Sequence, residues 1–403
     1  MTWKDRQPPV VITGIGTVNA LGGDAGSFWD SLVSGACGIR TVEDCFENEP
    51  GVLAAVVTAT LPHVRAAAPL SRTARLALAA AEEAVRQAGL EGACGKNRVA
   101  IVVGTTTGGI REAEDLIIRR AAGQPGRAGT LLSLEKSGVA DALASRFGFA
   151  GPRYTVQTAC ASGATAILVG FELVRRGLAD AALVGGTDAL ARLTLSGFRS
   201  LRLLDPTPCR PFDRARRGLS LGEGAGMLVL ERRQDAAARG AEILAVFLGA
   251  GQSTDAHHIT APATDGAGAA RAISEALDQA GVEPGSVDHV NAHGTGTLPN
   301  DAAEAAALHA VLGRRTESCP VTSIKGAVGH TLGAAGGIEA VAAVLTLRSG
   351  LVPPTVGLEE PDPALALDLV RGAARRMDVR VVLSNSFGFG GANAVLCLGS
   401  ADA

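Results

Sequence analysis

Cys160 lies where an extended-looking segment meets a helix of small residues, in the stretch TVQTACASGATAIL at residues 155–168. Ala164, Ile167 and Phe171 recur at helical spacing, so the cysteine falls at a strand-to-helix turn. The N-terminus of a helix presents unpaired N–H groups and partial positive charge, which favour a thiolate and can hold an oxyanion. The stretch therefore predicts a nucleophile, and the alternative is a buried cysteine that packs as a small hydrophobic residue.

Two histidines have similar surroundings later in the chain. His293 follows a predicted strand at residues 287–291 in VNAHGTGT, and His330 precedes a predicted helix in SIKGAVGH. Glycines and hydroxyl side chains surround both, without a bulky apolar neighbour. A cysteine with one histidine would indicate a cysteine hydrolase. Two neutral imidazoles instead suit the stabilisation of an enolate or carbonyl oxygen while the thiol carries an acyl group.

The composition is that of a soluble globular protein. The chain has 403 residues, 47% of them hydrophobic and 19% charged, and its net charge is -3. This charge gives no electrostatic reason to expect a nucleic acid or a membrane as partner. The 7 cysteines are dispersed without a CxxC or a metal-ligand cluster, which predicts reduced thiols and no bound metal. Without a signal peptide or an apolar stretch of about 20 residues, the sequence predicts a cytoplasmic protein.

Short β-rich segments alternate with helical patterns along the chain, which predicts an α/β fold with largely buried strands. A helix is expected from its N-cap Ser71 to Gly89, and another from Gly333 to Ser349. Each half of the chain has an apolar strand ending in a small-residue turn, TACASG in the first and SNSFGFGGAN in the second. A duplicated βαβ fold would place both turns against one site. The predicted strands include residues 10–12, 99–103, 181–184, 227–230, 287–291 and 379–383.

Together these motifs resemble the β-ketoacyl-acyl-carrier-protein synthases of the thiolase-fold superfamily, specifically the elongating type II branch. The similar motifs are TACASG, NAHGTGT, SIKGAVGH and NSFGFGGAN, with VVITGIGTVNALG, VAIVVGTTTGG and RPFDRARRGLSLGEGAGMLVLE also matching in order. The resemblance covers nearly the whole chain. It implies a thiolase fold of duplicated βαβαβαββ halves in an α-β-α-β-α layering, with an N-terminal half at residues 1–250 and a C-terminal half at residues 251–403.

The resemblance also implies a Claisen condensation in two stages. Cys160 would accept an acyl chain from the phosphopantetheine of an acyl carrier protein, with no cofactor of the enzyme's own. Malonyl-carrier protein would then lose carbon dioxide and attack the acyl thioester as an enolate, which His293 and His330 would stabilise. Besides the carrier protein, the implied partner is a second copy in a homodimer or, as the alternative, a cysteine-less homologue in a heterodimer.

Roles for the pocket residues follow from the same matching. Thr295 and Thr297 would contact the pantetheine arm. Phe389, in the GFGG turn, would act as the gate between the acyl pocket and the active site, with Phe387 beside it. Thr107 would line the acyl pocket, near a position where related enzymes often have a larger apolar residue.

The resemblance assigns two further roles next to the nucleophile. The backbone N–H groups of Cys160 and Phe389 would form the oxyanion hole. Lys325 would order the site through a charged partner, with Glu339 as the candidate. The alternative is that Lys325 forms an ion pair of structural importance only.

Several positions depart from the usual family pattern. The chain reads HGTGTLPND, with Gly296, Leu298 and Asn300 where fatty-acid enzymes commonly have HGTSTPxGD, and it has a His-His pair where they often have Tyr-His. With Thr107, the segment 61–78 and the loop LRLLDPTPCRPFD, these departures favour a polyene or aryl-polyene type II polyketide system. The arginines of that loop region are expected to be a solvated face, with a docking patch for an acidic protein as the alternative.

Two rival functions are considered. A silent chain-length partner typically lacks the active-site cysteine, so the presence of Cys160 argues against it. A degradative thiolase acting on coenzyme A esters would have a second cysteine in a glycine-rich turn near the C-terminus. Cys397 lies instead in the last predicted strand, and the two histidines favour decarboxylative condensation.

Overall fold

The structure is a computed structural model that describes residues 8–43, 45–46, 51–62, 70–91, 98–126 and 128–402. The segment 61–78, which the subfamily comparison uses, lies partly outside these ranges.

A single hydrogen-bonded sheet of ten strands runs through the molecule in the order β11-β10-β14-β15-β9-β1-β8-β6-β4-β5. Its two halves meet where β1 pairs antiparallel with β9, through Val10, Val11 and Ile12. The first half consists of β1 (Val10–Val18), β4 (Val99–Gly104), β5 (Arg153–Val156), β6 (Ala181–Asp188) and β8 (Gly224–Arg232). The second half consists of β9 (Ala245–Thr254), β10 (His289–Asn291), β11 (Val321–Thr322), β14 (Val381–Gly388) and β15 (Ala392–Gly399).

The two halves have the same topology, which confirms the predicted duplication. In the first half β1 and β6 both pair antiparallel with β8, and β4 pairs parallel with β6 and with β5. In the second half β9 and β14 both pair antiparallel with β15, and β10 pairs parallel with β14 and with β11. The expected boundary at 250/251 falls inside β9. We propose that the division lies in the connection before β9, after α7 (Arg233–Ala238).

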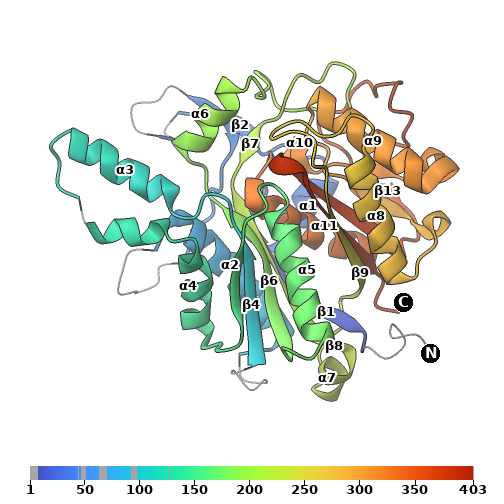
Figure 1. Cartoon of the computed structure of the whole chain (residues 1–403), viewed down its shortest axis with the longest axis horizontal. Helices are drawn as coiled ribbons and strands as arrows, with labels where there is room; N and C mark the ends of the chain where they lie inside the picture. The colour runs from blue at the N-terminus through green and yellow to red at the C-terminus, as the bar shows by residue number, and fades with distance from the viewer. Residues whose placement is uncertain are drawn as a thin grey trace.

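Helices cover the sheet in layers (Figure 1). α5 (Ser162–Arg175) and α11 (Ala335–Ser349) pack on each other and contact strands of both halves, so they form the middle layer. α2 (Arg72–Ala88) and α4 (Ser137–Phe147) pack on the outer face of the first half. α8 (Ala267–Ala280) packs on the second half and α9 (Leu298–Leu312) packs on α8. This is the expected α-β-α-β-α layering.

Matching glycines allow the outer helices to approach the sheet in each half. A Cβ on Gly16 of β1 would lie 2.1 Å from the Ala80 carbonyl oxygen of α2. A Cβ on Gly251 of β9 would lie 2.0 Å from the Ala272 carbonyl oxygen of α8. Since real Cβ atoms do not come so close to backbone, only glycine permits these contacts. The same packing device therefore occurs at equivalent strands of the two halves.

The two helices expected from capping residues are present. The Ser71 hydroxyl accepts the Ala74 N–H at 3.1 Å at the start of α2, and Gly89 ends the helix with a left-handed φ of 63°. α11 begins at Ala335, after a 3-10 turn at Leu332–Ala334. Residues 332–349 are long and apolar enough by composition to cross a membrane, but 83% of this window is buried inside the fold, as expected of a core helix.

The remaining elements surround this frame. α3 (Ile110–Ala121), with the 3-10 segment Ala128–Leu134, projects from the body as an arm (Figure 1). The other helices are α1 (Ala25–Val33), α6 (Arg192–Ser200) and α10 (Lys325–Val328). A small sheet contains β2 (Ile39–Val42), β3 (Val52–Ala55) and β7 (Leu221–Gly222), and a ribbon contains β12 (Leu351–Val352) and β13 (Arg375–Arg376).

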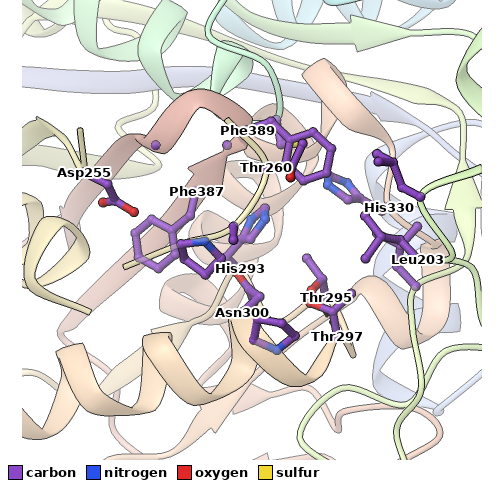
Figure 2. Close-up of a pocket in the computed structure, with 18 of the residues that line it drawn as sticks. Leu203, Asp255, Thr260, His293, Thr295, Thr297, Asn300, His330, Phe387 and Phe389 are labelled. Atoms are coloured by element: carbon purple, nitrogen blue, oxygen red, sulfur yellow. Dashed lines mark hydrogen bonds between the residues drawn. The ribbon is translucent and has the colours of Figure 1, made fainter. Parts of the chain in front are cut away.

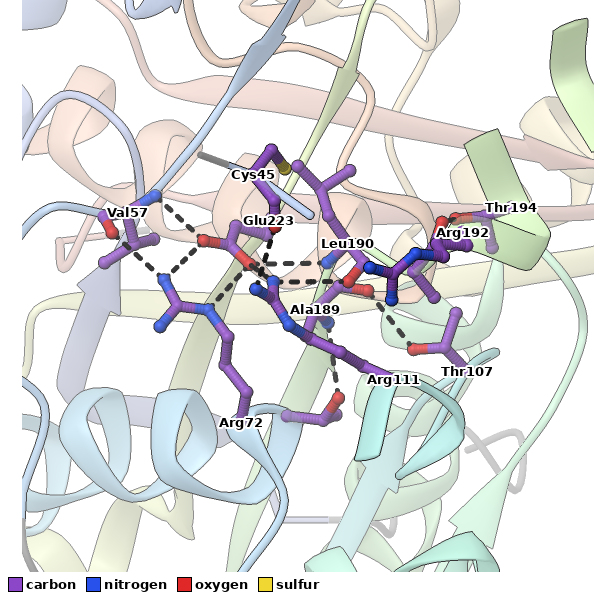
Figure 3. A network of polar contacts seen from close by, with 12 residues as sticks. Cys45, Val57, Arg72, Thr107, Arg111, Ala189, Leu190, Arg192, Thr194 and Glu223 are labelled. Carbon is purple, nitrogen blue, oxygen red and sulfur yellow. Dashed lines mark hydrogen bonds and ion pairs between the residues drawn. The ribbon is translucent and has the colours of Figure 1, made fainter. Parts of the chain in front are cut away.

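Glu223, between β7 and β8, is a buried carboxylate that joins several of these segments (Figure 3). It accepts from Arg72 Nε at 2.9 Å and from the N–H groups of Val57 at 3.1 Å and Leu190 at 3.3 Å. Arg111 of α3 reaches within 4.0 Å of the same carboxylate. Because an unpaired buried charge is costly, this network fixes the starts of α2 and α3 relative to the loop after β6.

Candidate active site

Cys160 occupies a tight turn between β5 and α5, as the sequence predicts. The preceding residue, Ala159, has a positive φ of 48°, which is unusual for a residue with a side chain. The Ser162 hydroxyl holds the turn, since it accepts the Thr158 N–H at 3.0 Å and donates to the Ala159 carbonyl at 2.6 Å. The turn presents the Cys160 side chain, which is 6% exposed, to a pocket between the two halves.

The thiol of Cys160 is more strongly protonated than the sequence predicts. Burial, with a smaller contribution from the nearby charge of Asp188, raises its pKa from 9.0 to about 11. The ammonium of Lys325 and the N–H groups of Phe389 and Cys160 itself act in the opposite direction. Desolvation outweighs these lowering effects, so the expectation that the helix terminus favours a thiolate in the resting enzyme is corrected to a neutral thiol.

His293 and His330 come together beside Cys160. Their ring centroids are 5.4 Å apart with the planes nearly perpendicular, and each residue is 2% exposed. Burial, followed by the charge of Lys325, lowers the pKa of both imidazoles well below 6.5, so both are neutral. The proximity of His330 adds to the effect on His293.

Hydrogen bonds fix which nitrogen of each imidazole carries the proton. Lys325 Nζ lies 3.3 Å from His293 Nδ1, and the Leu332 N–H donates to His330 Nδ1 at 3.3 Å. Because Nδ1 is an acceptor in both rings, each neutral imidazole carries its proton on Nε2. The site thus contains two N–H donors without a positive charge on either ring.

Lys325 and two buried glutamates support His293. Lys325 Nζ donates to the His293 carbonyl oxygen at 2.6 Å and forms the expected ion pair with Glu339, both side chains being 1% exposed. Glu304 of α9 accepts the N–H groups of His293 and Gly294, each at 2.8 Å. Burial raises the pKa of Glu304 to about 7. Backbone and ring of His293 are therefore held from two sides.

The pocket at this site has a volume of about 200 Å³ and is lined by residues from both halves (Figure 2). Thr295 and Thr297 line it with their hydroxyls 2.9 Å apart. Phe387 lies with its ring centroid 5.8 Å from that of His293, and Phe389 stacks on Phe198 at 5.6 Å. The lining also includes Cys160, Leu201, Leu203, Leu219, Asp255, Thr260, Ala261, Pro262, His293, Pro299, Asn300, His330, Gly388, Gly391 and Asn393.

Thr107, for which the family resemblance implies a place in the acyl pocket, is 2% exposed and does not line this pocket. Its place relative to an acyl chain stays a prediction. Its hydroxyl donates to Asp188 Oδ1 at 2.7 Å, at the end of β6. A hydroxyl with a buried partner is satisfied and has no need of a polar group on a substrate.

Sequence reasoning missed Glu304, Asp188 and Phe198. Glu304 is an isolated acidic residue in the alanine-rich helical stretch DAAEAAALHA, which is a signal for a buried carboxylate. Asp188 directly follows the apolar run of β6 and offers a similar signal. Phe198 has no comparable mark, because an aromatic residue on an amphipathic helix is ordinary.

In the arginine-rich loop Arg214 and Arg217 are exposed, as expected of a solvated face, whereas Arg216 is structural. Arg216 is 3% exposed and pairs with Asp362 at 2.7 Å and with Asp301 at 3.4 Å. Arg214 pairs with Glu360 at 3.0 Å, and Arg217 lies 3.8 Å from Asp205. Within the described ranges, no three Cys, His, Asp or Glu side chains are grouped so as to hold a metal ion.

A two-part fold with a cysteine, two neutral histidines and a lysine at its junction defines a thiol-dependent acyl-transfer enzyme. Residues 7–236 match the sequence model of the β-ketoacyl synthase N-terminal domain, and residues 244–359 match that of the C-terminal domain. The chain belongs to the β-ketoacyl synthase family.

Curated relatives and solved structures agree with this assignment. The chain is 38% identical to a 3-oxoacyl-[acyl-carrier-protein] synthase 2 of Synechocystis and 37% identical to that of Staphylococcus aureus, in each case over 96% of this chain and 97% of the relative. The ishigamide ketosynthase/chain length factor structure is similar with a TM-score of 0.92 and 38% identity, covering 98% of this chain and 99% of the other. A ketosynthase in complex with its chain length factor from Xenorhabdus doucetiae has a TM-score of 0.87 and 33% identity, covering 98% of each chain.

A degradative thiolase, the rival function, would have a second cysteine at the active site. Cys160 alone, among the cysteines that the structure describes, lines the pocket. Cys397 is fully buried in β15, where it packs in the apolar core of the second half.

Proposed function

We propose that this β-ketoacyl synthase condenses an acyl group held on Cys160 with malonyl-acyl-carrier protein. The observation that carries the proposal is the junction of a buried thiol with two neutral Nε2–H imidazoles at one pocket. Neutral donors stabilise a negative oxygen without being consumed as acids, which suits an enolate better than a hydrolytic intermediate.

The first stage transfers the acyl group. The Cys160 sulfur attacks the acyl thioester carbonyl, the bond to the carrier sulfur breaks, and the thiol proton ends on the departing carrier thiol. We propose that the N–H groups of Cys160 and Phe389 hold the oxyanion, because both already interact with the sulfur and lower its pKa. Because the neutral thiol dominates at pH 7, Cys160 must lose its proton as its sulfur attacks the carrier thioester.

The second stage forms the carbon–carbon bond. Malonyl thioester loses carbon dioxide, and its enolate oxygen is held by the Nε2–H groups of His293 and His330. The enolate carbon then attacks the acyl-Cys160 carbonyl, and the Cys160 thiolate leaves to give the β-ketoacyl thioester on the carrier. With a pKa of about 11, the released thiolate takes up a proton and resets the enzyme.

We assign the remaining pocket residues to substrate placement. Thr295 and Thr297 line the pocket with paired hydroxyls, which supports contact with the amides of the pantetheine arm. Phe389 stacks on Phe198 at the wall of an apolar cluster, which supports a gate role for Phe389, with Phe387 beside His293. Lys325 acts through His293, whose ring and carbonyl it contacts.

A single-turnover assay tests the reaction. Acyl-carrier protein and malonyl-carrier protein are incubated with the enzyme, and carbon dioxide and β-ketoacyl-carrier protein are measured. The native enzyme should form both in equal amounts, and Cys160→Ala should form no β-ketoacyl product. Product formation from two coenzyme A esters without carbon dioxide release would establish a thiolase instead.

We further propose that the carrier protein docks at the rim of this pocket. Leu201 lines the pocket and is exposed, and the exposed Arg199 and Arg202 lie on either side of it in sequence. Carrier proteins that present acidic residues would pair with such arginines. Arg199→Glu combined with Arg202→Glu should raise KM for the carrier thioester and leave the reaction with a small acyl-pantetheine unchanged.

We also propose that the chain works as a two-fold dimer in the cytoplasm. β5 ends the sheet, so its outer edge has unpaired backbone groups, and Tyr154 on it is exposed. We propose a homodimer. The alternative is a heterodimer with a cysteine-less homologue, as in the ketosynthase–chain length factor pairs. Light scattering and activity of the purified chain, alone and mixed with such a homologue, distinguish the two.

The reaction proposed above occurs both in fatty-acid synthesis and in polyketide synthesis, so the pathway is a separate proposal. The names of the relatives include both fatty-acid-type synthases and polyketide ketosynthases. We propose a specialised type II polyketide pathway, on the departures at Gly296, Leu298 and Asn300. Analysis of the chain products formed with the native carrier protein tests this choice.

A further inference from the structure

Three consecutive threonines converge on one buried carboxylate beside the active site. Residues 105–107 directly follow β4, and the hydroxyls of Thr105, Thr106 and Thr107 donate to Asp188 at 2.7, 2.5 and 2.7 Å. The N–H groups of Thr106 and Thr107 add bonds of 3.0 and 2.9 Å. In a regular strand adjacent side chains would point to opposite faces, so only the turn after β4 allows all three to reach Asp188.

Asp188 receives a further donor from the segment that carries His330. The Gly333 N–H, three residues after His330, donates to Asp188 Oδ2 at 2.7 Å. Asp188 itself is fully buried and ends β6. Its carboxylate therefore ties β4, β6 and the His330 segment together through six N–H and O–H groups, which occupy its acceptor sites and leave none for a substrate.

Close glycine contacts bring the start of α5, which follows Cys160, against the Gly333 segment beside Asp188. A Cβ on Gly163, three residues after Cys160, would lie 2.7 Å from the Gly333 carbonyl oxygen. A Cβ on Gly186, two residues before Asp188, would lie 2.1 Å from the same oxygen. The start of α5, the end of β6 and the His330 segment are thus in backbone contact around Gly333, whose N–H donates to Asp188.

We propose that Asp188, held by the threonine triplet 105–107, is a positioning residue that fixes His330 relative to Cys160 for condensation. This rests on the proposed function, in which His330 stabilises the enolate. A shift of the Gly333 segment by about 1 Å would misplace the Nε2–H donor, and misplacements of this size cost about 10²-fold in rate. Asp188 contacts no reacting atom, so its effect is transmitted by Gly333.

Asp188 also contributes to the electrostatics of the nucleophile, which supplies a second readout. The charged and titratable groups facing the Cys160 thiol are Asp188, Lys325 and the neutral His293 and His330. Burial is the main reason for the raised pKa of the thiol, and the charge of Asp188 adds to it. Removal of that charge should lower the thiol pKa, which can be measured without any substrate.

The decisive variant is Asp188→Asn. Its amide keeps one acceptor oxygen, but its NH₂ group faces donors such as the Thr106 and Gly333 N–H groups, which cannot reverse their role. We expect condensation by pre-acylated enzyme to fall about 10²-fold, acylation of Cys160 to fall less, and the pH profile of Cys160 alkylation by iodoacetamide to move to lower pH. The alkylation experiment is done in a protein that also carries Cys37→Ser, because Cys37 is exposed and would react with iodoacetamide as well.

The test also includes a matched control at another buried aspartate and two variants of Thr107 that disturb the site less than Asp188→Asn. Asp213→Asn changes another buried carboxylate, one that accepts the Ala215, Glu359 and Glu360 N–H groups away from the pocket, and should leave both readouts unchanged. Thr107→Val removes one hydroxyl and should slow condensation, while Thr107→Ser keeps the hydroxyl and should restore it. This pair keeps the test valid where Asp188→Asn fails to fold.

The outcomes separate the two proposals. An unchanged alkylation profile and unchanged condensation in Asp188→Asn, or equal rates in Thr107→Val and Thr107→Ser, would overturn the positioning role. If the native enzyme makes no β-ketoacyl product but Asp188→Asn still shifts the alkylation profile, the proposed function is overturned and the electrostatic effect of Asp188 on the Cys160 thiol stands. A change in product length alone in Thr107→Val would overturn the positioning role and return Thr107 to the acyl pocket.

Discussion

At the residue scale, the site works with neutral groups. Burial protonates Cys160 and deprotonates His293 and His330, so the free enzyme has little thiolate and no imidazolium at pH 7. Lys325 supplies positive charge nearby, but its ammonium is paired with Glu339. Charge therefore develops only when a substrate brings it, which suits a reaction whose key intermediate is an anion formed by loss of carbon dioxide.

Replacement of either histidine should separate the two stages of the reaction. In His293→Ala or His330→Ala, loss of one Nε2–H donor should reduce condensation by about 10²–10⁴-fold, while Cys160 still accepts an acyl group. Mass spectrometry of the acyl-enzyme and a product assay on pre-acylated enzyme measure the two stages. Equal loss in both would show that the replaced histidine activates the thiol.

The pH dependence of condensation should follow Glu304 rather than the histidines. The imidazole pKa values are held well below 6.5, whereas burial raises the pKa of Glu304 to about 7. As pH falls through 7 the carboxylate takes up a proton and one of its bonds to the His293 and Gly294 N–H groups weakens, so the rate should decline on the acid side. Glu304→Gln should be slower but flat between about pH 6 and pH 8. An inflection near 7 that persists in Glu304→Gln would assign it to another group.

The sequence was informative for the reacting groups and for one support, the Lys325–Glu339 pair, but not for the other supports. Cys160, His293 and His330 each lie in a short glycine-rich motif, so local pattern was enough to predict them. The raised thiol pKa depends on burial by both halves of the chain, and the partner of Thr107 lies 81 positions away. Long-range contacts of this kind have no local signal, which is why the contact between Thr107 and Asp188 was not predicted.

At the scale of elements, glycines inside two strands allow the outer helices α2 and α8 to approach the sheet closely. Glycine in a sequence favours turns, but Gly14, Gly16, Gly249 and Gly251 lie inside β1 and β9. These strands therefore extend beyond the short runs of apolar residues from which strands were predicted. The expected boundary at 250/251 cut β9 for the same reason, since the strand continues through its glycines to Thr254.

The contact at Gly163 should be tested with a helix-matched control. In Gly163→Ala the new Cβ would lie 2.7 Å from the Gly333 carbonyl oxygen and 2.9 Å from the Gly337 nitrogen, so α5 and the His330 segment must separate. Condensation should fall about 10²-fold, and stability by about 1–3 kcal/mol. Gly138→Ala, also the second residue of a helix that begins Ser-Gly, has open space around its Cβ and should change neither. Equal behaviour of the two variants in rate and denaturant midpoint would contradict this account.

The Glu223 network should stabilise the first half of the molecule. In Arg72→Ala the fully buried Glu223 loses its bidentate partner, and an uncompensated buried charge costs about 3–5 kcal/mol. Arg146→Ala breaks a partly exposed ion pair with Glu82 and should cost at most about 1 kcal/mol. Urea unfolding of both variants gives the comparison. A loss near 1 kcal/mol in Arg72→Ala would show that Arg111 alone compensates Glu223.

At the scale of the whole molecule, the duplicated halves close the active site within one chain. Cys160 comes from the first half, and His293, His330 and the Phe387–Phe389 turn come from the second, so one chain contains every proposed reacting group. A second subunit is therefore not required for the chemistry. Among the surfaces that the single chain leaves uncovered are the outer edge of β5 and the arm formed by α3 and the 3-10 segment Ala128–Leu134. Figure 1 shows the arm projecting from the body.

The arm presents large apolar side chains that a dimer would cover. Ile117 of α3 is 64% exposed and Leu132 of the 3-10 segment is 63% exposed. Burial of such side chains is favourable at about 25 cal/mol per Å², so an arm left in water would be costly. The combined change Ile117→Arg and Leu132→Arg should therefore convert the dimer to a monomer by light scattering. Leu178→Arg, at a side chain of 59% exposure after α5, should leave the dimer unchanged. A dimer of unchanged mass in the arm variant would place the interface on another face.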